Sequence, residues 1–255
     1  MTNANNDITI YIDSANQREK GHQLAESLTL PISTIRTNDK QQLLVLEDHL
    51  AYAAPNLGKP ISIDFTQGKN AHRRQFGGGR GQALAKAIGL KKGATPTIID
   101  TTAGYGRDAY VLATLGCTIT LIERNPILAA LLEDAIQRAQ HNKETQAIAQ
   151  RMQLIHHNAT DYLTGLSPKQ YPEVIYIDPM YPSRQKAALV KKEMQLLHQL
   201  IGPDTDSVEL LESAREIAKK RVAVKRPKSA PTIDRQKPST TVESKNTRYD
   251  IYVRN

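Results

Sequence analysis

The stretch TIIDTTAGYGRDAYVLATLG (residues 97–116) contains the turn on which our prediction of the fold rests. The apolar run that ends at Asp100 is typical of a buried strand, and residues 107–116 are typical of a helix. Gly104 and Gly106, between the two, permit a ligand to approach the backbone closely at the amino-terminal end of that helix. The stretch therefore predicts a strand, a ligand-binding turn and a helix.

Strands and helices continue to alternate from this stretch towards the carboxyl terminus. Further strands are predicted at residues 118–124, 153–157, 173–178, 221–227 and 248–254. Further helices are predicted at residues 125–140, 186–202 and 208–220. Helices of this length between strands favour an α/β fold with a mostly parallel, doubly wound sheet. The segment 229–246 is rich in Ser, Thr, Pro and Lys, and we expect it to form a mobile loop.

The residues before the alternating region predict a small N-terminal α+β subdomain. Residues 8–13, 43–47 and 61–65 have the pattern of strands, and residues 15–27 have apolar positions at helical spacing. The connector that follows (68–92) is basic and rich in glycine, and it ends in a predicted helix at residues 82–90. The expected division of the chain is therefore 1–67, 68–92 and 93–255.

The charge of the chain limits its partners. Its 255 residues include 34 Lys and Arg against 26 Asp and Glu, a net charge of +8. A basic excess favours a polyanion such as nucleic acid, although a generally solvated basic surface explains it equally well. With two Phe, ten Tyr and no Trp, we do not expect a broad stacking platform for single-stranded nucleic acid.

The composition also bears on metals, disulfides and location. Cys117 is the only cysteine, which excludes an internal disulfide framework and a cysteine-built zinc site. His156 and His157 have no partner at metal-ligand spacing, so no metal is expected. No apolar run approaches the roughly 18 residues of a membrane span, and the first residues lack the pattern of a secretory signal. We expect a cytoplasmic protein without a membrane partner.

The turn after Asp100 favours S-adenosylmethionine as the ligand. Glu123 lies 17 residues after Gly106, near the end of the next predicted strand, where a carboxylate can accept both ribose hydroxyls of an adenosine. Asp100 could attract the cationic methionine part of this cofactor. Arg107 and Asp108 stand where small residues would cradle a pyrophosphate, which disfavours NAD. An NAD site remains the alternative.

The stretch IYIDPMYP (residues 175–182) indicates the chemistry. It ends a predicted strand, so Asp178 is expected to face the same crevice as Gly104. Asp-Pro-Met-Tyr resembles the (D/N)PP(Y/F) motif of methyltransferases that act on exocyclic amines. Asp178 and the Pro179 carbonyl can accept the two N–H hydrogens of such an amine, and Tyr181 can stack on the extruded base. The alternative is an ordinary turn after a buried strand.

Several basic residues are candidates for RNA contacts. Arg73, Arg74 and Arg80 flank a run of three glycines, which suits a loop that approaches an RNA backbone or a flexible linker equally well. Lys225 and Arg226 end a predicted strand and could either contact phosphate or form a solvated strand end.

A family resemblance joins these motifs. AHRRQFGGGRGQALAKAIG, DTTAGYGRDAYVLATLGC, LIERNPILAALLEDA, YIDPMYP, ALVKKEM, VAVKRP and RYDIYV occur in order from about residue 71 onwards. Together they resemble the bacterial small-subunit rRNA guanine-N2 methyltransferases. The first 65 or so residues match that family much less distinctly.

The resemblance implies a class I, Rossmann-like methyltransferase domain at residues 93–255 that uses S-adenosylmethionine to modify one guanosine near the 3′ end of 16S rRNA. It implies the small ribosomal subunit or its RNA as partner, guided by the basic residues named above. It places Asp178 between cofactor and substrate. It also implies cofactor contacts at Arg107, Asp108, Glu123, Arg124, Asn158 and Ala159. The Asn158–Ala159 pair departs from the serines associated with that position, and Asn158 could instead cap a helix.

Other functions remain open on the residues alone. An adenine-N6 or cytosine-N4 methyltransferase would use the same Asp-Pro-Met-Tyr geometry, because this motif does not by itself select guanine. An NAD-dependent oxidoreductase would use the glycine-rich turn. A non-catalytic RNA-binding or assembly factor would use the basic residues only.

Overall fold

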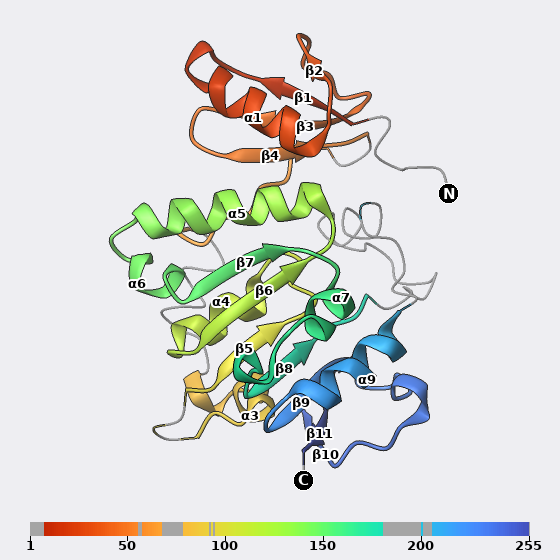
Figure 1. Ribbon diagram of the computed structural model, residues 1–255. Coiled ribbons are helices and arrows are strands. Elements are labelled where there is room, and N and C mark those ends of the chain that lie inside the picture. Colours follow the sequence, from red (N-terminus) through yellow and green to blue (C-terminus); the bar gives the residue numbers. More distant parts are fainter. Residues whose placement is uncertain are drawn as a thin grey trace.

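The computed structural model describes residues 8–55, 58–67, 79–91, 93, 95–180, 200 and 206–254. A seven-stranded sheet and a smaller four-stranded sheet dominate this part of the chain (Figure 1). The candidate residues Arg73, Arg74 and Tyr181 lie outside the described residues, as does the predicted helix 186–202 except for Leu200. No helix in the described ranges is both long enough and apolar enough to cross a bilayer.

The large sheet has the strand order β10-β11-β9-β8-β5-β6-β7. Its strands are β5 (Thr97–Asp100), β6 (Thr118–Glu123), β7 (Met152–His156), β8 (Val174–Ile177), β9 (Arg221–Pro227), β10 (Thr240–Glu243) and β11 (Thr247–Val253). The strands from β5 to β9 are parallel to their neighbours, whereas β11 runs antiparallel to β9 and β10 antiparallel to β11. The predicted mostly parallel sheet is confirmed.

Helices cover both faces of this sheet, as a doubly wound fold requires. The described helices of the region are α3 (Ala83–Ile88), α4 (Arg107–Thr114), α5 (Pro126–His141), α6 (Gln146–Ala149), α7 (Ala159–Thr164) and α9 (Ser207–Ile217). Helices α3, α4 and α5 share one apolar core with one face of the sheet. Helices α7 and α9 bury the opposite face in a second core. Single 3₁₀ turns occupy Gly79–Gly81, Pro168–Gln170 and Ile233–Arg235.

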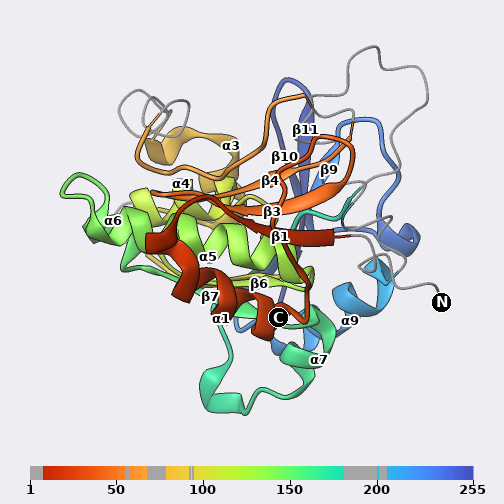
Figure 2. The ribbon, with the colours of Figure 1, turned by 90° about the horizontal axis from the view of Figure 1, so that it is seen from above.

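The small sheet lies on the outer side of α5. It contains β1 (Ile8–Ile12), β2 (Ile32–Ser33), β3 (Gln41–Val45) and β4 (Leu50–Ala53) in the order β2-β1-β3-β4. The 3₁₀ turn Ala15–Gln17 and helix α1 (Arg18–Leu28) follow β1. Seen from above, this sheet and α1 cover α5 (Figure 2). The predicted α+β character of the N-terminal residues is confirmed.

One predicted strand was wrong, and strand β4 was not predicted. Residues 61–65 do not form a strand, because only Ile61 pairs with a neighbouring segment, at Tyr52. Their alternation is nevertheless real, since Ile61, Ile63 and Phe65 are buried in the core while the residues between them are not. Strand β4 was missed because all four of its residues are buried, which removes the alternating pattern.

The segment 229–246 is also not simply a loop. Its residues Thr240–Glu243 form β10, which pairs with β11 at the edge of the large sheet. An edge strand exposes most of its side chains, and the burial of β10 follows that pattern. The polar composition that suggested a loop therefore reflects an exposed strand.

Asp134 in the middle of α5 links the two sheets. This carboxylate is buried, and it accepts hydrogen bonds from Lys20 Nζ of α1 (2.8 Å), from the Leu50 N–H of β4 (3.0 Å) and from Arg138 Nε (2.9 Å). Burial alone would raise the pKa of Asp134, but these hydrogen bonds outweigh it and hold that pKa below its usual value. Arg138 also donates to the carbonyl of Ile63, in the segment that leads out of the small sheet.

Replacing Asp134 by alanine is expected to lower the free energy of unfolding by about 3 kcal/mol, because three donors lose one buried acceptor. Denaturation in urea measures the change. The adjacent exposed residue provides the control: Glu133→Ala should change the free energy of unfolding by less than about 0.5 kcal/mol. Equal stabilities of the two variants would contradict the linking role of Asp134.

Candidate functional site

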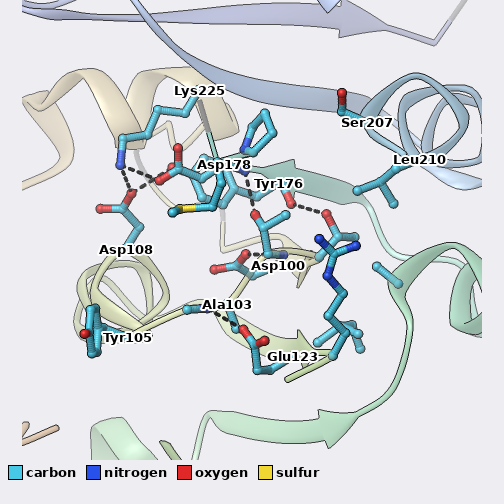
Figure 3. A pocket seen from close by; sticks show the side chains of 18 of the residues that line it. Asp100, Ala103, Tyr105, Asp108, Glu123, Tyr176, Asp178, Ser207, Leu210 and Lys225 are labelled. Atoms are coloured by element: carbon cyan, nitrogen blue, oxygen red, sulfur yellow. Dashed lines mark hydrogen bonds and ion pairs between the residues drawn. The ribbon is translucent and has the colours of Figure 1, made fainter. Parts of the chain in front are cut away.

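A cavity of about 510 Å³ opens at the carboxyl ends of the parallel strands (Figure 3). Segments that follow β5, β6, β7, β8 and β9 contribute to its wall. Of the predicted site residues, the wall includes Asp100, Gly104, Arg107, Asp108, Glu123, Arg124, Asn158, Ala159, Asp178, Pro179, Lys225 and Arg226. Asp178 and Gly104 thus share one crevice, which was the geometric condition of the sequence prediction.

The two glycines of the turn have different reasons to be glycine. Both have a positive φ, 54° at Gly104 and 66° at Gly106. Gly104 lines the cavity, as predicted. Gly106 does not line it, and a Cβ there would lie 2.8 Å from Leu132 Cδ1 and 3.1 Å from Phe65 Cζ. Close packing under the turn therefore gives a reason for glycine at Gly106, and the predicted approach of a ligand to it stays a prediction.

Glu123 is held at the end of β6 by backbone N–H groups of two segments, the turn after β5 and the start of α5. It is buried, and its Oε2 accepts the N–H of Gly104 (3.0 Å) while its Oε1 accepts the N–H of Asn125 (2.8 Å). A carboxylate has about four acceptor sites, so it can still accept hydroxyl hydrogens from a ligand. The two hydrogen bonds from backbone N–H groups fix the orientation of the carboxylate towards the cavity, as binding of the ribose hydroxyls requires.

Three carboxylates and one ammonium group meet on the opposite wall (Figure 3). Lys225 Nζ lies 2.8 Å from Asp108 Oδ2 and 2.7 Å from Asp178 Oδ2. The hydroxyl of Tyr176 donates to the same Oδ2 of Asp108 (2.7 Å). Asp100 lines the cavity beside them. This cluster has a net negative charge when all three carboxylates are ionised.

The strand register explains the meeting of Asp178 and Lys225. In the parallel pair β8–β9, Ile177 lies beside Val224, so the next position of each strand places 178 beside 225. Tyr176 precedes Asp178 by two residues and therefore points to the same face of the sheet. Sequence reasoning missed Tyr176, although this spacing of two was a signal that could have found it.

Asp100 is almost completely buried at the end of β5. Burial raises its pKa to about 8, assisted by the nearby Asp108 and Asp178 carboxylates and opposed by the Thr102 N–H and by Lys225. Its carboxyl group is therefore mostly protonated at neutral pH when no cation is bound. A cationic ligand beside it would favour the ionised form.

The remaining cofactor candidates have partners of their own. Arg124 pairs with Asp206 at 2.9 Å, and the guanidinium of Arg107 lies over the ring of Tyr105, 5.1 Å from its centre. The Asn158 side chain accepts the Asp161 N–H and caps α7, so the capping alternative is correct. All four cofactor candidates, Arg107, Arg124, Asn158 and Ala159, still line the cavity.

Of the basic residues predicted to contact RNA, the structure describes Arg80, Lys225 and Arg226, and these three do not lie together on one surface. Arg80 donates to the carbonyls of Lys91 (2.6 Å) and Leu115 (3.2 Å). Those residues precede β5 and β6, so Arg80 lies at the opposite edge of the sheet from the cavity. Arg226 is 4% exposed and donates to the carbonyl of Pro231. These contacts give Arg80 and Arg226 structural roles that the sequence did not indicate.

Lys225 also differs from its prediction. Its ammonium group does not extend from the strand end as a phosphate contact would, because it lies between the carboxylates of Asp108 and Asp178. Burial lowers its pKa, but these two carboxylates outweigh burial and raise the pKa of Lys225 above its usual value. Lys225 therefore remains a cation at any physiological pH.

The residues present fit S-adenosylmethionine. The cavity has the size of a small-molecule site. Glu123 suits the ribose hydroxyls, and Ile122, Ala159 and Leu210 give the wall an apolar part for the adenine ring. The buried carboxyl of Asp100 suits a cationic group, which would favour its ionised form.

Comparisons with known proteins point in the same direction. A family model described as "Putative SAM-dependent methyltransferase" matches residues 23–254. Ribosomal RNA small subunit methyltransferase J of Shewanella amazonensis is 52% identical over 225 residues, which cover 87% of this chain and 90% of that protein. The protein of the same name from Pseudomonas paraeruginosa is 46% identical, with 94% and 92% covered.

A solved structure supports the fold. The crystal structure of a SAM-dependent methyltransferase from Neisseria gonorrhoeae matches with a TM-score of 0.77 at 36% sequence identity. The match covers 96% of this chain and 95% of that chain.

The affinity for S-adenosylmethionine is expected to rise about tenfold or more between pH 6 and pH 8. A cationic ligand needs ionised Asp100, whose pKa of about 8 keeps it protonated at lower pH, so binding releases a proton. Calorimetry in buffers of different ionisation enthalpy measures both quantities. Asp100→Asn, which cannot titrate, should bind with an affinity that is nearly independent of pH. A flat profile for the unsubstituted protein would argue against the predicted role of Asp100.

Replacing Glu123 by alanine is expected to weaken S-adenosylmethionine binding by at least tenfold while changing RNA binding little. The ribose hydroxyls would lose their acceptor, and the Gly104 N–H would lose its partner. Calorimetry and a filter-binding assay measure the two affinities, and Glu133→Ala serves as the exposed control. Unchanged cofactor affinity in Glu123→Ala would exclude the ribose role.

Proposed function

The chain belongs to the SAM-dependent methyltransferase family whose model spans residues 23–254, and from this premise we propose that it methylates the exocyclic N2 of one guanosine in 16S rRNA. Its curated relatives at 46–52% identity are named as methyltransferases of the small-subunit ribosomal RNA. They support S-adenosylmethionine-dependent methylation of 16S rRNA by this chain. We propose that it acts in the cytoplasm. The choice of guanine N2 rests on the resemblance of its motifs.

One observation supports this proposal most directly: Asp178 and Pro179 line the same cavity as Gly104 and Glu123. A cofactor whose ribose is bound at Glu123 would then lie within reach of an amine bound at Asp178. The Asp178 N–H donates to Thr102 Oγ1 at 2.6 Å, which ties the substrate segment to the loop after β5.

S-adenosylmethionine supplies an electrophilic methyl group on a sulfonium. The residues of this chain supply orientation and charge. An aryl amine is a poor nucleophile because its lone pair is delocalised into the ring. The Asp178 carboxylate and the Pro179 carbonyl accept its two N–H hydrogens, which aims the nitrogen at the donor and stabilises the positive charge that develops on it. Tyr181, outside the described residues, is proposed to stack on the base.

Radiolabelled methyl transfer into 30S particles and into bare 16S rRNA, followed by nucleoside analysis, tests the proposal. Incorporation as N2-methylguanosine is the expected result. Label in N6-methyladenosine or N4-methylcytidine would show that the substrate base is adenine or cytosine and not guanine. Normal RNA binding without any incorporation would instead identify a non-catalytic factor.

The NAD alternative has a separate test. Protection against heat by S-adenosylhomocysteine but not by NADH is expected, since a ligand stabilises the native state that binds it.

Replacing Asp178 by alanine is expected to reduce methyl transfer by at least 100-fold without unfolding the protein, because the amine loses its charged acceptor. Asp178→Asn keeps one carbonyl oxygen and should retain more activity. Asp161→Ala, at an exposed position outside the cavity wall, is the matched control and should be fully active. Single-turnover kinetics with a melting curve for each variant measure the effect. Near-normal turnover in Asp178→Ala would remove the proposed acceptor.

A further inference from the structure

Lys225 occupies a position that the methyl-transfer scheme above does not use. Its ammonium group bridges the Oδ2 atoms of Asp108 and Asp178, at 2.8 and 2.7 Å. The side chain is 29% exposed, so the bridge is partly shielded from water. Asp178 is the residue to which we assign the substrate amine, and Lys225 is the cation it contacts.

The bridge is anchored on several elements. Asp108 belongs to the first turn of α4, Asp178 follows β8, and Lys225 belongs to β9. The hydroxyl of buried Tyr176 donates to Asp108 Oδ2 at 2.7 Å, and the pKa of Tyr176 is raised by its burial, so it stays a donor. Asp178 is thus held at two points: its backbone N–H donates to Thr102, and its carboxylate contacts Lys225.

The charges around Asp178 show what the ammonium group does there. Among the described residues, the groups that interact electrostatically in this cluster are Asp100 from β5, Asp108 from α4, Tyr176 and Asp178 from the end of β8, and Lys225 from β9, with Tyr249 of β11 beside Tyr176. Of these described groups, Lys225 carries the positive charge. Without it, repulsion between the carboxylates would favour protonation of Asp178. A protonated Asp178 would present a hydroxyl donor to the amine and would lose part of its acceptor capacity.

We propose that Lys225 is a positioning residue for methyl transfer, which keeps the Asp178 carboxylate ionised and turned towards the substrate amine. Because Lys225 binds Oδ2, and a carboxylate has about four acceptor sites, Asp178 can bind the ammonium group and the amine at the same time. This inference rests on the proposed function, since it concerns the acceptor assigned there. It replaces the expected phosphate contact of Lys225 with a role inside the cavity.

Kinetics of two variants over a range of pH test the role. Lys225→Met keeps the length of the side chain but not its charge, and Lys225→Arg keeps the charge. In Lys225→Met, kcat at pH 7 should fall about 100-fold with little change in the KM for 30S particles, as expected for a misplaced reacting group. The acidic limb of its pH profile should move upward by at least one pH unit. Lys225→Arg should recover most of the rate and the original profile.

A second readout does not depend on turnover. Carbon-13 NMR of aspartate carboxyl groups, with Asp178→Asn used to assign the signal, follows the protonation of Asp178 in the protein alone. Its midpoint should lie at least one pH unit higher in Lys225→Met than in the unsubstituted protein, while melting curves and affinity for S-adenosylhomocysteine stay similar. An Asp178 midpoint that is the same in both proteins would overturn the proposal. So would a Lys225→Met variant that loses only RNA affinity, because that identifies a phosphate contact.

The two proposals fail in different ways. If the unsubstituted protein methylates a base other than guanine, the proposed function is wrong, whereas the effect of Lys225→Met on Asp178 still stands. If the protein forms N2-methylguanosine and Lys225→Met has the same kcat and pH profile, only the role of Lys225 is wrong.

Discussion

The parallel register of three neighbouring strands is the constraint on which the cavity depends. Asp100 of β5 lies beside Tyr176 of β8, and Ile177 of β8 lies beside Val224 of β9. Parallel strands end at one edge of a sheet, so residues that leave these strands meet there without any contribution from a flexible loop. The carboxylates and the lysine of the site therefore occupy positions that the apolar core on both faces fixes. A shift of one residue in β9 would turn Lys225 to the opposite face of the sheet.

The buried carboxyl of Asp100 makes the stability of the folded state depend on pH. The folded pKa of Asp100 lies at about 8, above its ordinary value of 3.8, so the folded state holds a proton that the unfolded chain releases. The stability that this group contributes is therefore complete at acid pH and declines as the pH rises from about 4 to about 8. Strongly shifted pKa values cluster at functional sites, and a cationic ligand is the partner that would restore the ionised form of Asp100.

Sequence reasoning succeeded where local pattern and global structure agree. Strand β9 was predicted with its observed bounds, since its apolar residues lie between two charged ends. The turn at Gly104 and the carboxylate at Glu123 were found because a ligand-binding strand–turn–helix has its own spacing. Buried β4 was missed, and residues 61–65, of which only Ile61 pairs with another segment, were wrongly assigned to a strand, because alternation reports burial and does not report pairing. The role of Lys225 could not be predicted, because no local pattern states which strand lies beside which.

Helix α5 gives the small sheet a mechanical connection to the cavity. Asn125, which caps this helix, donates its N–H to Glu123, and Asp134 on the same helix binds α1 and β4. An α-helix rises about 1.5 Å per residue, so these two attachment points lie roughly 13 Å apart on one stiff rod. A force that pulls the N-terminal sheet away from α5 would therefore act on the helix whose N-cap residue holds the Glu123 carboxylate.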